Sequence, residues 1–195
     1  MKTIYLVRHG QTVFNLRHKI QGWCDSPLTA EGIKQGEWVK RYFDEQNIQI
    51  EDAYASTSER ACDTLELITD LPYQRVKGLK EWHFGRFEGE PEYLNPPLPY
   101  GDFFVTYGGE SEIEFKERIS QTIQQIVNDA SAQSILIVSH GAACRQFMRQ
   151  WAHTSAVDQK SPLKNGCILI FHYQNNQFRL DKIINPASEI NENAH

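Results

Sequence analysis

Two histidine–glycine pairs in this sequence each follow directly on a short apolar run. Residues 4–12 read Ile-Tyr-Leu-Val-Arg-His-Gly-Gln-Thr, and residues 134–141 read Ser-Ile-Leu-Ile-Val-Ser-His-Gly. Short runs rich in β-branched residues predict buried strands. Open α/β sheets bind ligands at the carboxyl ends of their parallel strands. We therefore expect His9 and His140 to lie in the same crevice.

Two arginines are expected to accompany the histidines. Arg8 precedes His9, and Arg60 falls in the first turn of a helix predicted after a second strand. The free backbone N–H groups and the dipole of a helix N-terminus favour an anion. Two planar guanidinium forks suit the oxygens of a phosphoryl group. These positions predict a pocket for a phosphoryl group, although Arg60 alone would fit a surface ion pair equally well.

Glu81 supplies a carboxyl group where the chain leaves the sheet, just after the apolar Leu79. A carboxyl held beside a cleft can act as a general acid, whereas taken alone Glu81 would be read as a solvated side chain. An imidazole nitrogen is a competent nucleophile toward phosphorus. Fixed cations neutralise charge on the transferring group. The set of residue types therefore indicates covalent phosphoryl transfer that needs no metal ion and no cofactor.

The composition is typical of one soluble globular domain. The chain has 195 residues, of which 40% are hydrophobic and 23% charged, with a formal net charge of −5. Lys and Arg never run longer than two, which argues against a nucleic-acid partner. No apolar stretch approaches the ~20 residues that span a bilayer, and no secretory signal precedes the first strand. We expect a cytoplasmic protein without membrane contacts, whose four cysteines are free thiols.

Predicted strands and helices alternate along the chain. Strands are expected at residues 3–8, 52–56, 75–77 and 134–139, with a terminal hairpin at 166–173 and 178–184 turned at Asn175-Asn176. Helices are expected at residues 29–45, 56–69, 111–129 and 142–152. Capping-box patterns begin two of these helices, at Ser56 to Glu59 and at Ser111 to Glu114. The alternation predicts an α/β fold with three αβα layers: a mainly parallel central sheet and helices on both faces.

Residues 87–110 interrupt this alternation, because they combine four prolines with six aromatic residues. No regular element is expected among so many prolines. A long aromatic loop inside a compact domain is typical of a lid or binding loop, and a partly disordered insertion is the alternative. We predict a single domain over residues 1–184 with a helical and loop lid inserted at about 82–130. Residues 185–195 are predicted to be a flexible tail.

The motifs and their order resemble those of the histidine phosphatase superfamily, also called the phosphoglycerate mutase-like family. The resemblance spans residues 1–184 and is highly specific, because seven linked motifs occur in the order of that family. They are Arg8 to Thr12 with Asn15, Gln21-Gly22-Trp23, Asp25 to Thr29, Ser56 to Ala61 with Thr64, Leu79 to Glu81 with Gly85 and Glu88-Gly89, Gly109 to Ser111 with Arg118, and Ser139-His140-Gly141.

The resemblance implies a role for each matched site residue. His9 would be the nucleophile that becomes phosphorylated, and Glu81 the proton donor. The phosphate pocket would be formed by Arg8, Arg60 and His140, with further contacts from Asn15 and the Gly141 backbone, while Gln21 and Gly22 would line the substrate side. The substrate would be a small-molecule phosphomonoester. The resemblance leaves open whether the chain forms a homodimer.

Three functions fit this pocket: a phosphatase, a cofactor-dependent phosphoglycerate mutase and a non-catalytic protein-binding module of the same fold. Residues 87–115 hold no Lys or Arg but seven acidic residues: Glu88, Glu90, Glu92, Asp102, Glu110, Glu112 and Glu114. An acidic lid is expected to repel a bisphosphorylated acid and to suit a less charged leaving group. This favours the phosphatase, although Arg17, His18 and Lys19 could supply the missing positive charge. Turnover of p-nitrophenyl phosphate without added metal would distinguish an enzyme from a binding module.

Overall fold

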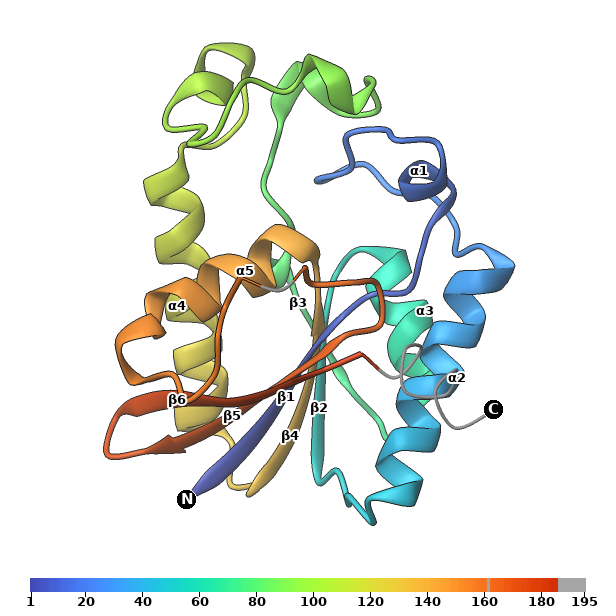
Figure 1. Ribbon diagram of the computed structural model, residues 1–195, viewed down its shortest axis with the longest axis vertical. Coiled ribbons are helices and arrows are strands. Elements are labelled where there is room, and N and C mark those ends of the chain that lie inside the picture. Colours follow the sequence, from blue (N-terminus) through green and yellow to red (C-terminus); the bar gives the residue numbers. More distant parts are fainter. Residues whose placement is uncertain (161, 186–195) are drawn as a thin grey trace.

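The computed structural model describes residues 1–160 and 162–185, so most of the predicted tail lies outside the described residues. Six strands form one mixed sheet in the order β3-β2-β4-β1-β5-β6 (Figure 1). They are β1 (Lys2–Arg8), β2 (Asp52–Ser56), β3 (Gln74–Val76), β4 (Ser134–Ser139), β5 (Ile168–Gln174) and β6 (Gln177–Ile184). Strands β1 to β4 are parallel, and the predicted hairpin β5-β6 adds an antiparallel edge. The predicted α/β fold with a mainly parallel sheet is confirmed.

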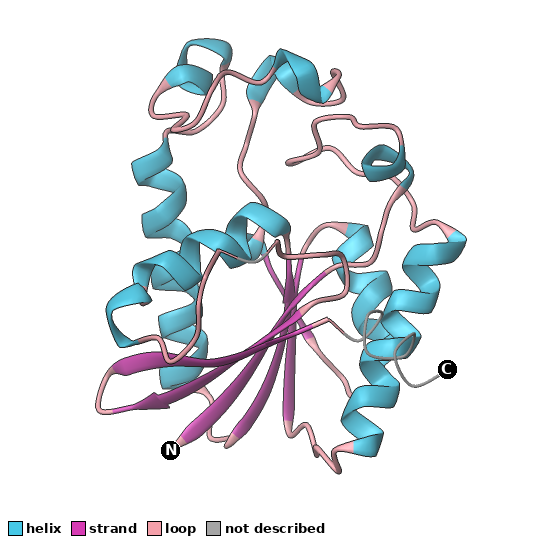
Figure 2. Cartoon of the chain, in the orientation of Figure 1, coloured by secondary structure: helices cyan, strands magenta, loops and turns pink. Residues whose placement is uncertain are grey.

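Helices cover both faces of the sheet, as Figure 2 shows. Helices α2 (Ala30–Glu45) and α3 (Glu59–Ile68) pack on one face, and α4 (Glu112–Asp129) and α5 (Gly141–Gln150) on the other. Within β1, Ile4 and Leu6 join the α4–α5 core while Tyr5 and Val7 join the α2–α3 core. This period of two fixes the register of β1, because a slip by one residue would exchange the two faces. Among the described helices, none is long and apolar enough to cross a membrane.

The two predicted capping boxes have different outcomes. Ser111 and Glu114 form a capping box at the start of α4, as predicted. The box predicted at Ser56 is wrong, because α3 begins at Glu59 after Ser58, which makes no side-chain cap bond. The Ser56 hydroxyl lies 2.8 Å from Nε2 of His140 instead. The Ser56 hydroxyl therefore belongs to the site at the strand ends and does not cap α3.

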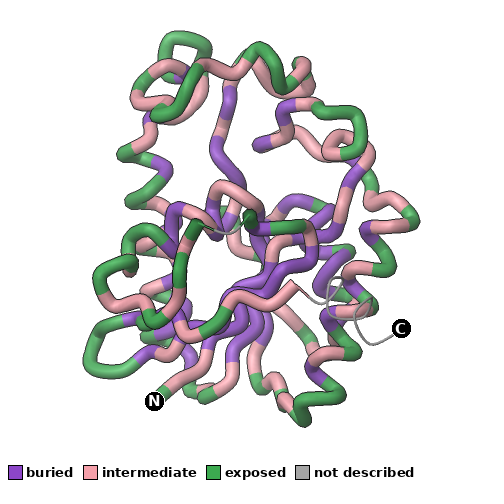
Figure 3. Tube along the Cα trace, viewed as in Figure 1, coloured by how far each residue is buried: buried purple, intermediate pink, exposed green. Residues whose placement is uncertain are grey.

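Residues 82–111, part of the segment predicted to be a lid and called the lid below, are more regular than expected. The lid contains three short 3-10 helices, at Gly85–Phe87, Glu92–Leu94 and Phe103–Tyr107. Aromatic rings inside the lid pack edge to face, as between Phe84 and Phe104, whose centroids are 4.9 Å apart. Helix α4 lies within the predicted insertion range of 82–130 but packs on the sheet as part of the core layer. Figure 3 shows buried residues concentrated in the sheet and exposed ones on the outer loops of the lid.

The lid is joined to the loop that follows β1, which contains the short helix α1 (Val13–Leu16). Backbone hydrogen bonds run from Ile20 N to Glu90 O (2.7 Å), from Gly89 N to Ile20 O (2.9 Å) and from Glu92 N to His18 O (2.8 Å). In Figure 1 both segments lie above the carboxyl ends of the parallel strands. The lid and this loop therefore cover the edge of the sheet where the two histidines were predicted.

Candidate active site

The two histidines meet at the ends of two neighbouring strands. In the parallel pair β1–β4, Arg8 lies opposite Ser139, so His9 and His140 leave the sheet at the same level. Their rings are buried and contact edge to face, with centroids 5.3 Å apart. The two side chains therefore lie side by side at the carboxyl ends of their strands, as the parallel register predicts.

His9 is oriented through its other ring nitrogen. Its Nδ1 lies 2.7 Å from the Gly10 carbonyl oxygen, so an Nδ1–H tautomer leaves the lone pair on Nε2. Burial, followed by the charges of Arg60 and Arg8, lowers the pKa of His9 well below its usual value. The backbone is fixed as well, because Thr64 Oγ1 accepts from Gly10 N at 3.0 Å and Asn165 Nδ2 donates to His9 O at 3.1 Å. His9 is therefore a neutral, oriented imidazole that is suited to act as a nucleophile.

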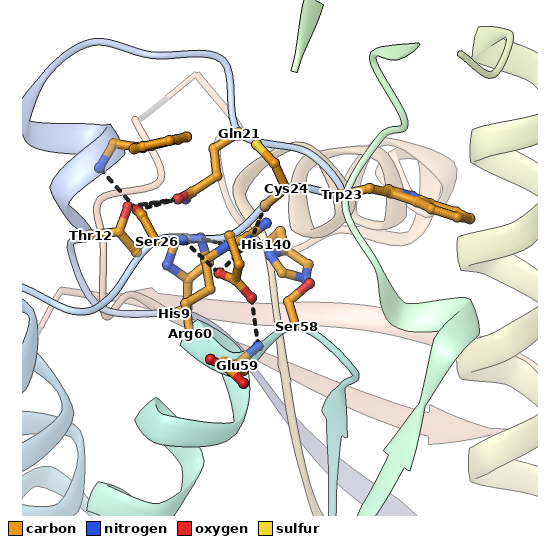
Figure 4. Close-up of polar contacts among 12 residues, drawn as sticks. His9, Thr12, Gln21, Trp23, Cys24, Ser26, Ser58, Glu59, Arg60 and His140 are labelled. Atoms are coloured by element: carbon orange, nitrogen blue, oxygen red, sulfur yellow. Dashed lines mark hydrogen bonds and ion pairs between the residues drawn. The ribbon is translucent and has the colours of Figure 1, made fainter. Parts of the chain in front are cut away.

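Arg60 is fully buried beside His9 and holds the loop above it (Figure 4). Its Nε donates to His9 Nε2 at 3.2 Å. Nη1 donates to Cys24 O and to Asp25 Oδ1, both at 2.9 Å, and Nη2 donates to Gly22 O at 2.8 Å. When a phosphoryl group enters, the Nε–H must turn to one of its oxygens so that Nε2 can attack. Arg60 thus has two roles: it holds the loop after β1 in place, and it puts a positive charge beside His9.

Unpaired polar atoms surround the position that a phosphoryl group would occupy. Arg8 Nη1 donates to Leu163 O at 2.5 Å, but its Nε is buried without a partner in the described part of the chain. His140 Nδ1 is also buried and unpaired there. Burial, then Arg60 and His9, lowers the pKa of His140 well below its usual value. Because buried polar atoms are rarely left without a partner, these atoms indicate an anion site.

Gly141, the first residue of α5, brings the N-terminus of that helix against Arg8. A Cβ atom at Gly141 would lie only 3.1 Å from Arg8 Nε. Such a distance is tighter than most real Cβ contacts, so a larger residue would displace the guanidinium group. Glycine therefore allows the arginine and the helix terminus, both favourable to anions, to converge on one point.

Glu81 is a buried carboxyl group at the start of α5. Its oxygens accept from Ala142 N at 2.8 Å and from Ala143 N and Trp82 N, both at 3.0 Å. Burial raises the pKa of Glu81, although these N–H groups and the two arginines act in the opposite direction. Arg118 Nη2 and Trp23 Nε1 each donate to the Glu81 carbonyl at 3.1 Å and fix its backbone. Glu81 therefore keeps a proton to higher pH than an ordinary carboxyl group, as a general acid requires.

A cavity of about 320 Å³ opens in front of His9 and Glu81. Six of the nine predicted site residues line it: Arg8, His9, Asn15, Gln21, Glu81 and Gly141. Arg60, His140 and Gly22 are not part of its lining. Arg60 and His140 contact His9, and the Gly22 carbonyl accepts from Arg60. Asn15 Oδ1 and Gln21 Oε1 accept from Thr12 N (3.1 Å) and Ser26 Oγ (2.6 Å), so both side chains are held in place.

The sequence interpretation missed the polar residues at the far end of this cavity. Arg145, Gln146 and Arg149 of α5 line it, together with Lys19 and with Asn95 of the lid. Helical spacing could have indicated the first three. Residues 145, 146 and 149 lie on the same face of a helix as residues 141 and 142. Lys19 was named as a source of positive charge, whereas nothing in the sequence distinguished Asn95.

Most of the acidic residues of segment 87–115 do not line the cavity. Glu110 pairs with Arg118 at 2.6 Å, Glu112 pairs with Lys116 at 2.6 Å, and Glu114 caps α4. Among the seven acidic residues of segment 87–115, all of them described, only Glu92 lines the cavity. The expectation that this segment repels anionic substrates therefore lacks its physical basis. The carboxylates of Glu110, Glu112 and Glu114 instead bind Arg118, Lys116 and the start of α4.

Glu88 binds the lid to the loop after β1 through backbone N–H groups. Its carboxylate accepts from Gly22 N, Cys24 N and Phe84 N at 3.0 Å each, and from Trp23 N at 2.8 Å. Burial alone would raise the pKa of Glu88, but the Cys24 thiol and these N–H groups together lower it. The ionised carboxylate is therefore part of the folded structure.

Replacing Glu88 with alanine is expected to lower the free energy of unfolding by about 2–4 kcal/mol, because buried N–H donors lose their acceptor. Glu90→Ala is the matched control, since Glu90 is exposed on the same loop. Urea denaturation at several pH values measures both variants. Because its pKa is lowered in the folded state, the Glu88 carboxylate stabilises the fold at pH values above the usual pKa of Glu. This contribution disappears as the pH falls. The gap between wild type and Glu88→Ala should shrink on acidification, and equal stabilities at neutral pH would contradict this role.

Within residues 1–160 and 162–185, no group of three or more His, Cys, Asp or Glu side chains could hold a metal ion. The chain matches the histidine phosphatase superfamily (branch 1) over residues 4–186. It belongs to this superfamily.

Relatives within the superfamily include phosphatases and mutases. The chain is 26% identical over 192 residues to a metal-independent phosphoserine phosphatase of Arabidopsis thaliana, covering 91% of this chain and 79% of the relative. It is 31% identical to a 2,3-bisphosphoglycerate-dependent phosphoglycerate mutase of Nitrosococcus oceani, covering 74% of this chain and 78% of the relative. The crystal structure of a phosphoserine phosphatase from Entamoeba histolytica with 3-phosphoglyceric acid matches with a TM-score of 0.76 and 27% identity, covering 94% of this chain and 96% of that chain.

Proposed function

We propose that this histidine phosphatase superfamily member hydrolyses a small-molecule phosphomonoester through a phosphohistidine at His9, without a metal ion. One observation carries the proposal: a neutral, oriented His9 and a buried Glu81 of raised pKa line the same cavity. The similarity to a metal-independent phosphoserine phosphatase supports it.

In the first step, the lone pair on His9 Nε2 attacks phosphorus and the bond from phosphorus to the ester oxygen breaks. Arg8 and Arg60 neutralise the charge on the other phosphoryl oxygens, and His140 donates a hydrogen bond to them. Protonated Glu81 gives its proton to the departing alkoxide, so that the ester oxygen leaves as a hydroxyl group.

In the second step, Glu81 is a carboxylate and accepts a proton from water. The hydroxide that forms attacks the phosphohistidine, and the phosphorus–nitrogen bond breaks with its electron pair returning to Nε2. Inorganic phosphate leaves, and both His9 and Glu81 return to their starting protonation states.

A phosphoglycerate mutase is the second candidate, because a mutase is among the relatives and Lys19, Arg145 and Arg149 line the cavity. In a mutase the phosphohistidine would pass its phosphoryl group to a bound hydroxy acid instead of water. Both candidates share the first step and differ only in the acceptor.

The acceptor can be measured directly. The purified protein is given 3-phosphoglycerate with catalytic 2,3-bisphosphoglycerate, and free phosphate and 2-phosphoglycerate are both followed over time. We expect release of phosphate to exceed isomerisation, with the rate unchanged by EDTA and inhibited by vanadate. Isomerisation faster than hydrolysis would favour the mutase, and activity restored only by Mg²⁺ after EDTA would contradict the metal-independent mechanism. Failure to hydrolyse even p-nitrophenyl phosphate would favour a binding module.

A further inference from the structure

Ser56, the last residue of β2, lies beside His140. Strands β2 and β4 are parallel neighbours with Ala55 opposite Val138, so Ser56 and the residue that follows β4 leave the sheet together. Ser56 is fully buried, and its hydroxyl oxygen lies 2.8 Å from Nε2 of His140. In the described part of the chain, the other ring nitrogen of His140, Nδ1, is buried and unpaired. Ser56 thus occupies one ring nitrogen and leaves Nδ1 for a phosphoryl oxygen.

The direction of this hydrogen bond decides what Nδ1 presents to the phosphoryl group. A neutral imidazole, the form that the lowered pKa of His140 favours, carries one proton. If the proton is on Nε2, the Ser56 oxygen accepts it, and the Nδ1 lone pair meets phosphoryl oxygens that are acceptors as well. If the proton is on Nδ1, Ser56 donates its hydroxyl proton to Nε2, and Nδ1 can donate to a phosphoryl oxygen. Only the second arrangement suits a site that binds an anion.

The surroundings of the Ser56 hydroxyl favour the donating direction. Ser58 N donates to the Ser56 hydroxyl oxygen at 3.3 Å, so this oxygen already accepts from one N–H group. The hydroxyl proton has two acceptors nearby: His140 Nε2 at 2.8 Å and the Ser58 hydroxyl oxygen at 3.5 Å. Only the shorter of these distances is typical of a hydrogen bond from a hydroxyl group. The hydroxyl proton is therefore best placed on the line to Nε2.

His9 and His140 then carry the same tautomer for opposite tasks. In His9 the Nδ1–H group lies 2.7 Å from the Gly10 carbonyl oxygen, and Nε2 keeps the lone pair that attacks phosphorus. In His140 the Ser56 hydroxyl occupies the Nε2 lone pair, and Nδ1–H remains as a donor. Each ring would fail in the other tautomer, because His9 would lose its lone pair and His140 its donor.

We propose that Ser56 is a positioning residue that sets the tautomer of His140. By donating its hydroxyl proton to Nε2, Ser56 keeps the single imidazole proton on Nδ1, where it binds a phosphoryl oxygen. The effect on turnover rests on the proposed function, whereas the tautomer itself is measured without turnover.

The tautomer is tested by ¹⁵N NMR of protein labelled at histidine, because protonated and unprotonated imidazole nitrogens have well-separated shifts. The signals of His140 are those that disappear in His140→Ala. We expect Nδ1 protonated and Nε2 unprotonated, both in the free protein and with inorganic phosphate bound, and a mixture of tautomers in Ser56→Ala. A proton on Nε2 of the wild-type protein, with or without one on Nδ1, would overturn the proposal, and this result needs no variant at position 56.

The consequence for the reaction is tested with p-nitrophenyl phosphate. Ser56→Ala should lower kcat/KM and weaken inhibition by vanadate by about five- to a hundredfold, the range for a buried acceptor that loses its donor. Ser56→Thr keeps the hydroxyl group and should restore most of the loss. Ser58→Ala is the matched control, because it removes a neighbouring buried hydroxyl that makes no hydrogen bond to His140, and it should keep the wild-type rate.

A double-mutant cycle separates control of the tautomer from a general structural role. Because Ser56 acts through His140, adding Ser56→Ala to His140→Ala should change kcat/KM by no more than about twofold. An undiminished loss in that background, or wild-type activity in Ser56→Ala, would overturn the positioning role while leaving the phosphatase intact. No turnover of p-nitrophenyl phosphate by the wild type would overturn the proposed function, whereas the tautomer and its dependence on Ser56 would still be seen by NMR.

Discussion

Replacing His9 with alanine is expected to abolish turnover of every phosphomonoester that the enzyme hydrolyses. The variant has no atom to carry the phosphoryl group, and removal of a covalent nucleophile costs on the order of 10⁶ in rate in other enzymes. Steady-state release of phosphate from p-nitrophenyl phosphate and from an alkyl phosphate measures the loss. His153→Ala, at an exposed position outside the cavity lining, should keep the wild-type rate.

A second arm of the same experiment separates chemistry from folding. The alanine leaves a gap beside Arg60 and Gly10, and added imidazole is expected to restore a fraction of the turnover of p-nitrophenyl phosphate. Circular dichroism compares the folded state of the variant with that of the wild type. A folded His9→Ala variant that still hydrolyses alkyl phosphates at an appreciable fraction of the wild-type rate would remove His9 from the mechanism.

Replacing Glu81 with glutamine is expected to slow alkyl phosphates by about 10²–10⁴-fold, the usual contribution of general acid catalysis. Glutamine can still accept from Ala142 N or Ala143 N through its carbonyl oxygen, but it has no proton to give to an alkoxide. The phosphorylation step with p-nitrophenyl phosphate should be affected far less, because p-nitrophenolate leaves without a proton. Burst kinetics resolves that step from hydrolysis of the phosphohistidine, in which Glu81 also acts.

The pH profile gives the same prediction an independent readout. Glu81 must be protonated to donate, so phosphorylation by alkyl phosphates should decline as the pH rises through its raised pKa. His9 must be neutral to attack phosphorus. Because its pKa is lowered, we expect activity to be lost on the acid side only at a pH well below the usual pKa of histidine. Glu81→Gln should lack the alkaline decline. Equal losses on alkyl and p-nitrophenyl esters at the phosphorylation step would mean that Glu81 only shapes the pocket.

The sequence predicted the positions where strands end better than it predicted side-chain partners. The two strand-to-His-Gly junctions could be predicted because short apolar runs and parallel register determine where His9 and His140 lie. The helix start at Ser56 was mispredicted, because a local capping pattern cannot reveal that His140, distant in the sequence, takes the hydroxyl group.

The lid shows that the acidic residues of a segment need not face the substrate cavity. Glu88 and Glu110 are bound by backbone N–H groups and by Arg118, contacts that depend on how the chain folds back on itself. The charged residues that do line the cavity include Arg145 and Arg149 of α5, which the sequence pattern did not single out. Helical spacing places Arg145 and Arg149 on the same face of α5 as Gly141, but only the packed structure shows that this face lines the cavity.

The most direct test of the phosphohistidine mechanism is to identify the residue that carries phosphate during turnover. Enzyme mixed rapidly with ³²P-labelled substrate is quenched under alkaline conditions, in which a phosphoramidate is stable, and the labelled peptide is sequenced by mass spectrometry. We predict label on His9 that is lost in acid, is formed and consumed at rates consistent with turnover, and is absent from His9→Ala. Label on another residue, or label that persists in His9→Ala, would contradict the mechanism.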